Sequence, residues 1–171
     1  MWKLKTIEAE NLCAFRSLSY MLRQGVTTLI FGDNRDNESQ QSNGAGKSAL
    51  LECIAVGITG SPLRKIRSEE IINDAAEECR IALRFINDSA AEELLVNRRS
   101  PRKGASSVSC TLYRGGKQVV TDEAVQPSVD AYNRYILDKL GITRDELLNN
   151  FILSKYRYED FLSSSDKEKK E

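Results

Sequence analysis

The chain has 171 residues, of which 40% are hydrophobic and 29% charged, a composition that fits one globular domain and excludes disordered, collagenous and solenoid chains. Its 25 basic and 25 acidic side chains cancel, which excludes nucleic-acid binding through overall positive charge. The absence of histidine excludes Ser-His-Asp and Cys-His catalysis and imidazole metal ligands. No apolar run approaches the roughly 20 residues that span a bilayer, and no signal peptide opens the chain. We therefore expect a cytoplasmic protein that does not contact a membrane.

The first 60 residues predict a strand, a loop and a helix. Apolar and polar residues alternate over residues 2–9, which indicates a strand with one solvated face and a bulge near Thr6. The β-branched run at residues 26–31 ends at Gly32 and predicts a buried strand that enters a loop. Apolar residues recur at helical spacing over residues 47–58, so we expect a helix that packs one face on a sheet.

The rest of the chain predicts antiparallel strands followed by helices. Apolar residues alternate in three stretches between residues 79 and 112, and the two glycines of Arg114-Gly115-Gly116-Lys117 favour a tight hairpin turn. Helical spacing follows, and a capping box from Thr143 to Glu146 opens another short helix. We expect a single α/β domain over residues 1–171, with a core at 1–60, a separate antiparallel β-lobe at 78–120, a helical segment at 127–164 and the start of a further helix at 165–171.

The four cysteines predict reduced thiols in the core. They are widely spaced and form no CxxC pair, which disfavours a zinc site or a redox pair. They are Cys13, Cys53, Cys79 and Cys110.

The one strong chemical motif is a phosphate-binding loop between the expected strand and helix. In such loops glycines let backbone N–H groups close around a β-phosphate, a lysine reaches the β- and γ-phosphate oxygens, and a serine hydroxyl binds magnesium. The residues that fit these roles here are Asn43, Gly44, Ala45, Gly46, Lys47, Ser48 and Ala49.

The motif departs from GxxxxGK[ST] at one position, because Gln41 stands where a glycine is expected. If the loop begins at Gly32, residues 35–42 are an insertion, which we expect to extend into solvent rather than fold over a ligand. Two alternatives remain: a glycine-rich helix start without a ligand, and a nucleotide site that has lost its function.

These segments together resemble the N-terminal half of the ATPase head of SbcC-type and SMC-like coiled-coil ABC ATPases, in the branch of double-strand-break repair enzymes and phage recombination endonucleases. The resemblance rests on residues 11–15, on the run from 26 to 34, on the phosphate loop, on residues 60–64, and on 151–162, which is similar to the Q-loop stretch of that family. It implies a P-loop NTPase fold and a long coiled coil that begins near Ser165.

The resemblance also implies the ligands and the site. It implies ATP and Mg²⁺ as cofactors, with Lys47 as the catalytic lysine and Ser48 as the magnesium ligand. The family has a nucleotide-contacting arginine where this chain has Cys13, which leaves Arg16 or Arg64 as substitutes. Lys155 stands in place of the Q-loop glutamine, and Asn34 lies at the loop entry.

The chain contains no convincing Walker B strand or ABC signature. The nearest candidates are residues 119–123, with only two apolar residues before Asp-Glu, and the hairpin at 114–118. In the family both motifs lie after the coiled coil. The resemblance therefore implies half of a composite ATPase, inactive alone, whose partners are the C-terminal half of the same head, a second head, a nuclease subunit and DNA.

Two basic clusters, at residues 64–67 and 98–103, are candidate contacts to a DNA backbone, although such runs are more often solvated faces. Two further functions stay open. One is an SMC- or RecF-like DNA clamp without a nuclease, and the other is a small P-loop kinase, which the β-rich middle of the chain disfavours.

Overall fold

The computed structural model describes residues 1–32, 46–119 and 128–152. Their strands form one antiparallel sheet in the order β2-β1-β3-β4-β5-β6. The strands are β1 (Lys3–Leu12), β2 (Phe15–Met21), β3 (Glu78–Asn87), β4 (Glu92–Pro101), β5 (Ser107–Arg114) and β6 (Lys117–Val119). The helices are α1 (Lys47–Thr59), α2 (Val129–Leu140) and α3 (Arg144–Glu146), with short 3₁₀ turns at Ser68–Ile71 and Asp88–Ala90 and a π-turn at Leu147–Phe151.

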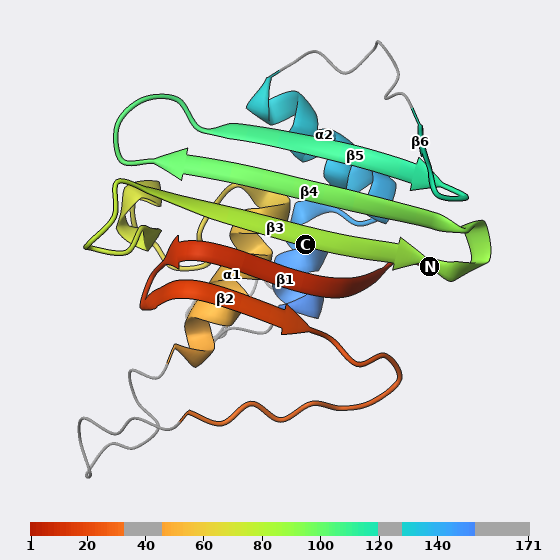
Figure 1. Ribbon diagram of the computed structural model, residues 1–171, viewed down its shortest axis with the longest axis horizontal. Coiled ribbons are helices and arrows are strands. Elements are labelled where there is room, and N and C mark those ends of the chain that lie inside the picture. The colour runs from red at the N-terminus through yellow and green to blue at the C-terminus, as the bar shows by residue number, and fades with distance from the viewer. Residues whose placement is uncertain (33–45, 120–127, 153–171) are drawn as a thin grey trace, which may run out of the picture.

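The described residues form two layers, with the sheet in front and the helices behind it (Figure 1). Helix α1 packs against β1, β3 and β4, and α2 packs against β5 and α1. The core lies between the layers, where alternate residues of the strands point inward, as expected for a sheet with one covered face. Among the described residues, no element covers the other face of the sheet (Figure 1).

The mixed α/β fold is confirmed, together with several local predictions. The register of β1 against β3 shifts between Leu4 and Thr6, which is the expected bulge. Gly115 and Gly116 have φ values of 56° and 76° and form the expected tight turn. The capping box at Thr143 is also present, because its side chain and that of Glu146 each accept the other's backbone N–H.

The segment at 78–120 is antiparallel as expected, but it does not form a sheet of its own. Strand β3 pairs with β1 over Lys3 to Glu10, so the lobe continues the sheet that the N-terminal hairpin begins. Strand β2 was not expected from the sequence. The residue boundaries of the four predicted segments remain predictions.

The prediction of a buried strand at residues 26–31 is wrong for the described part of the chain. The segment forms no strand, and Val26, Leu29 and Phe31 are 60%, 73% and 81% exposed. It follows the edge strand β2 and lies beyond that edge in Figure 1. The β-branched composition gives the preference for a strand, but a strand also needs a hydrogen-bonding neighbour, and none of the described strands pairs with it.

The prediction of core thiols is confirmed for Cys53, Cys79 and Cys110, which are free and buried, whereas Cys13 is free but only half-buried. Burial raises the pKa of Cys53 and Cys110 from 9.0 to about 12, and that of Cys79 to about 11. These groups are therefore thiols in the folded chain at pH values at which they ionise in the unfolded chain.

We expect alkaline pH to destabilise the fold through these thiols. The pKa of each thiol is higher in the folded chain than in the unfolded chain. The contribution of the protonated thiols to stability is therefore complete below pH 9 and is lost as pH rises towards the folded pKa values. Each thiol lowers the free energy of unfolding by about 1.4 kcal/mol per pH unit in that window. Urea unfolding between pH 8 and pH 11 measures how the free energy of unfolding changes with pH. Cys110→Ala should reduce this pH dependence by about the contribution of one thiol. An unchanged slope in that variant would contradict the assignment.

Candidate functional site

The N-terminal end of α1 has no side-chain cap. Gly46 precedes the helix in the left-handed conformation, with φ 82°, and the first turn carries no acidic residue. Lys47 and Ser48 open the helix, and Ser48 is exposed. Backbone N–H groups and the positive end of the helix dipole therefore meet no negative side chain of their own helix. This is the arrangement in which helix ends bind phosphate groups.

The structure places part of the predicted site at this helix end. Gly46, Lys47, Ser48 and Ala49 lie together, and the Ala49 N–H donates to the Gly46 carbonyl over 3.0 Å. Arg16 and Arg64 are also described, whereas five predicted residues lie outside the described part of the chain: Asn34, Asn43, Gly44, Ala45 and Lys155.

The ring of Phe15 closes one side of this helix end. A Cβ atom added at Gly46 would lie 2.8 Å from Cζ and 3.1 Å from Cε1 of Phe15. The positive φ of Gly46 disfavours a side chain for a second reason. Glycine is therefore required at position 46 both by its backbone conformation and by the aromatic ring against it.

A buried ion pair ties α1 to the segment that follows it. Glu52 is 2% exposed, and its carboxylate accepts the Leu63 N–H over 2.7 Å and the Arg64 Nε–H over 2.8 Å. The Arg64 N–H donates to the same carboxylate over 3.3 Å. A buried carboxylate is stable only with such partners. Glu52 therefore fixes both the backbone and the side chain of Arg64.

Arg64 also contacts the position where the family has its arginine. Its Nη2 donates to Sγ of Cys13 over 3.6 Å, and Cys13 lies two residues before Phe15 in the β1–β2 turn. Burial raises the pKa of the Cys13 thiol, and Arg64 opposes this shift. Of the two proposed substitutes for the missing arginine, Arg64 is the one held beside Cys13, whereas Arg16 is exposed on β2.

Sequence reasoning missed Glu52 and Phe15. Glu52 gave a usable signal, because it is a charged residue on the apolar face of α1, between Ala49 and Val56, which are both buried. Phe15 belongs to residues 11–15, which carry part of the resemblance, but no local pattern relates it to Gly46, because the two lie in distant segments.

The two basic clusters are largely engaged within the fold. Arg98 is buried, Arg99 donates to Glu78 over 2.6 Å, and Arg102 donates to the carbonyls of Ile72, Asn73 and Ala76. Arg64 is paired with Glu52 as described above. Most of these side chains have structural partners, so the runs of positive charge in the sequence do not form two continuous basic patches.

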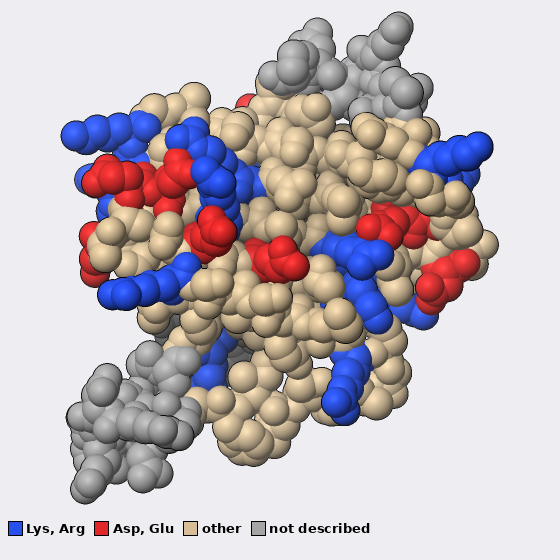
Figure 2. All heavy atoms as spheres, viewed as in Figure 1, with Lys and Arg blue, Asp and Glu red and all other residues tan. Residues whose placement is uncertain are grey.

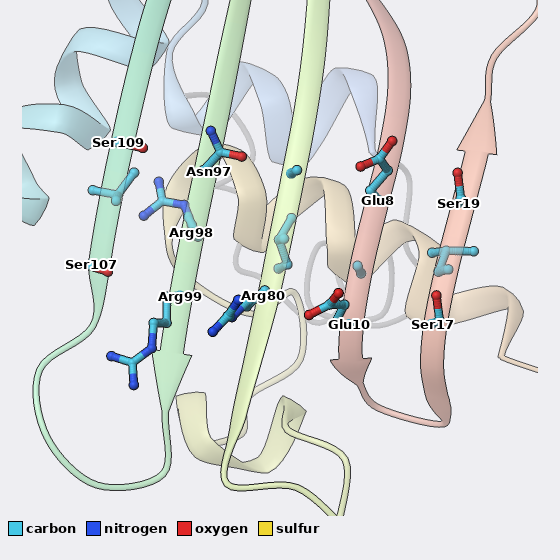
Figure 3. A pocket seen from close by; sticks show the side chains of 15 residues that line it. Glu8, Glu10, Ser17, Ser19, Arg80, Asn97, Arg98, Arg99, Ser107 and Ser109 are labelled. Carbon is cyan, nitrogen blue, oxygen red and sulfur yellow. The ribbon is translucent and has the colours of Figure 1, made fainter.

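A hollow lies on the open face of the sheet, away from the helices (Figure 3). It has a volume of about 750 Å³ and is lined largely by small polar and charged side chains. Glu8 and Glu10 on β1 lie across from Arg80 and Arg99 on β3 and β4, with serines on β2 and β5 at its sides (Figure 3). Positive and negative side chains lie beside one another mainly toward the two sides of this view, with uncharged residues over much of the area between them (Figure 2). This is the expected surface of a solvated sheet and does not include the N-terminus of α1.

The described residues hold neither a cluster of metal ligands nor a membrane-spanning helix. No three His, Cys, Asp or Glu side chains among them are grouped so that they could hold a metal ion. No helix in residues 1–32, 46–119 and 128–152 is long and apolar enough to cross a membrane.

Comparison with known proteins places the chain in a family. A family model described as an AAA domain matches residues 6–171. The chain belongs to this AAA domain family. It is 30% identical over 130 residues to the DNA double-strand break repair Rad50 ATPase of Methanosarcina acetivorans, and 28% identical over 130 residues to that of Methanosarcina mazei. The resemblance to SbcC- and SMC-like ATPase heads is thereby confirmed.

Solved structures support the same fold. The chain resembles a structure of the recombination mediator protein RecF with ATP, with a TM-score of 0.52 and 19% identity over 70% of this chain and 28% of that one. The alignments with the two Rad50 ATPases cover 72% of this chain and 11% of each relative. The chain thus corresponds to a small part of the proteins it matches.

Proposed function

We propose that this chain is the ATP-binding part of an SMC- or SbcC-like ATPase that acts in DNA repair or recombination. One observation carries the proposal: the uncapped end of α1, with Gly46 in the left-handed conformation before Lys47 and Ser48, in a chain related to Rad50 ATPases. The alternative of a helix start without a ligand leaves the phosphate-loop sequence unexplained.

The residues of this helix end fit ATP and Mg²⁺. The backbone N–H groups after Gly46 bind phosphate oxygens, Lys47 supplies a positive charge to the β- and γ-phosphates, and the exposed Ser48 hydroxyl is the Mg²⁺ ligand. Mg²⁺ neutralises the charge that develops on the phosphates. Asn43, Gly44 and Ala45 complete the loop. Arg64, held by Glu52 beside Cys13, takes the place of the family's nucleotide-contacting arginine.

The proposed partner in the same head is its C-terminal half. The segment at 26–31 supports this, because it is apolar, β-branched and exposed, with Ile30 43% exposed in addition to the residues given above. A strand from the C-terminal half would bury these side chains and pair the backbone. The further proposals follow from the family: two heads that dimerise around ATP, a nuclease subunit, DNA as the substrate, and a cytoplasmic location.

Magnesium dependence tests the proposed site. We expect Mg²⁺ to raise the affinity of the chain for ATP by about tenfold or more, and Ser48→Ala to remove most of this gain, because the variant lacks the hydroxyl ligand. Isothermal titration of ATP with Mg²⁺ and with EDTA measures the difference.

Ser19→Ala, on the open face of the sheet, is the matched control and should behave as the wild type. Equal gains in Ser48→Ala and in the wild type would contradict the assignment of Ser48.

A DNA clamp without a nuclease is the second candidate function. The fold similarity to RecF favours it, since that structure matches over 70% of the chain. The two candidates share the ATP site and differ in whether a nuclease subunit is bound. Copurification of a nuclease subunit with the native protein would favour the SbcC-like ATPase over the clamp.

A further inference from the structure

Arg98 is a buried cation on β4 that contacts α1 and α2. Its side chain is 6% exposed. Its Nε donates to the Gly57 carbonyl over 2.7 Å and its Nη2 donates to the Ile58 carbonyl over 3.0 Å, both in the last turn of α1. The same Nη2 also donates to Oδ1 of Asn133 on α2.

The partners of Arg98 are unusual for a buried charge. No carboxylate among the described residues pairs with it, and burial lowers its pKa from 12.5 to about 10. The cation is stabilised instead by carbonyl oxygens at the negative end of the α1 dipole. Burying a guanidinium in this way is costly, so the contact is specific rather than incidental.

The same guanidinium also lies close to Gly60 at the end of α1. A Cβ atom added at Gly60, which ends the helix with φ 75°, would lie 3.1 Å from Nη1 of Arg98 and 3.4 Å from Nδ2 of Asn133. The C-terminal end of α1, β4 and α2 are thus joined at one point.

We propose that Arg98 is a positioning residue that couples the phosphate-binding helix to α2. The inference rests on the proposed ATP site at the other end of α1. That helix has 13 residues and so spans about 20 Å, with the phosphate loop before its first residue and Arg98 at its last turn. When ATP orders α1, the hydrogen bonds of Arg98 to the α1 carbonyls become more stable. The bond from the same guanidinium to Asn133 then stabilises α2. By linkage, stabilising α2 raises the affinity for ATP by the same factor.

Hydrogen exchange of α2 tests this coupling in the full chain. Exchange of peptides from Val129–Leu140 is measured with and without saturating Mg²⁺-ATP, and ATP affinity is measured separately by titration. In the wild type we expect ATP to slow exchange in α2 by about fivefold or more. Asn133→Ala, which removes the acceptor, should reduce the effect to less than about twofold. Asn133→Asp keeps an acceptor oxygen and should retain it.

Two further variants separate coupling from folding. Arg134→Ala removes an exposed neighbour on α2 and should behave as the wild type. Asn133→Gln keeps the amide but displaces its oxygen, so it should also lose the ATP-dependent slowing of exchange in α2. It serves as the test if Asn133→Ala does not fold. Unchanged ATP-dependent protection in folded Asn133→Ala or Asn133→Gln, or no protection in the ATP-bound wild type, would overturn the coupling alone. A wild-type chain that does not bind ATP would overturn the proposed function as well.

Discussion

ATP hydrolysis by residues 1–171 alone is expected to stay at the background rate, even when the chain binds ATP. The phosphate loop supplies positioning and part of the charge neutralisation, but hydrolysis also needs a carboxylate that orients water and a signature serine from the opposite head. The family carries both in its C-terminal half, and the sequence of this chain offers no convincing counterpart. When parts that act together are separated, the rate falls by several orders of magnitude.

Adding the C-terminal half of the head in trans should restore turnover, measured as phosphate release. The control is the same mixture with Lys47→Ala, which should stay at background. Robust, Lys47-dependent hydrolysis by residues 1–171 alone would contradict this prediction and favour a self-sufficient P-loop enzyme. Asp122 and Glu123 would then be the first carboxylates to replace.

Lys47→Ala is expected to weaken ATP binding by the completed head about 100-fold or more. The variant loses the ammonium group that we propose donates to the β- and γ-phosphate oxygens. Two charge-assisted hydrogen bonds are worth about 3 kcal/mol or more, which corresponds to about 100-fold in affinity. Isothermal titration with Mg²⁺-ATP measures the change.

Lys103→Ala, which removes an exposed lysine in the β4–β5 connection, is the matched control and should keep wild-type affinity. Equal affinities for Lys47→Ala and Lys103→Ala would show that the helix end is not a working phosphate site.

The local features of the fold were predictable because each depends on neighbouring residues. The helical spacing over 47–58 anticipated α1 (Lys47–Thr59), and the glycines at 115 and 116 anticipated the turn between β5 and β6. Gly46, Lys47 and Ser48 were assigned from their order in the chain, and the structure places them together at the end of α1. Composition, period and turn chemistry carry this kind of information.

The long-range features were not predictable, because each depends on residues that are distant in the sequence. Residues 26–31 have the composition of a buried strand, but burial depends on a neighbour that residue patterns do not supply. Phe15 contacts Gly46, which lies 31 residues further along the chain. The hydrogen bonds of Arg98 join it to Gly57, 41 residues away, and to Asn133, 35 residues away. Arg98 was assigned to a basic cluster because other basic residues follow it within residues 98–103, but the sequence does not show that its side chain is buried.

The central claim, that this chain is one part of a composite ATP-dependent head, is tested most directly by assembly. Sedimentation velocity of the chain mixed with the C-terminal half of the head, with and without Mg²⁺-ATP, measures it. We predict a one-to-one complex that dimerises only with Mg²⁺-ATP, and a weakened complex for Phe31→Ser, which alters an exposed apolar side chain of the 26–31 segment. Two components that sediment separately under both conditions would contradict the account.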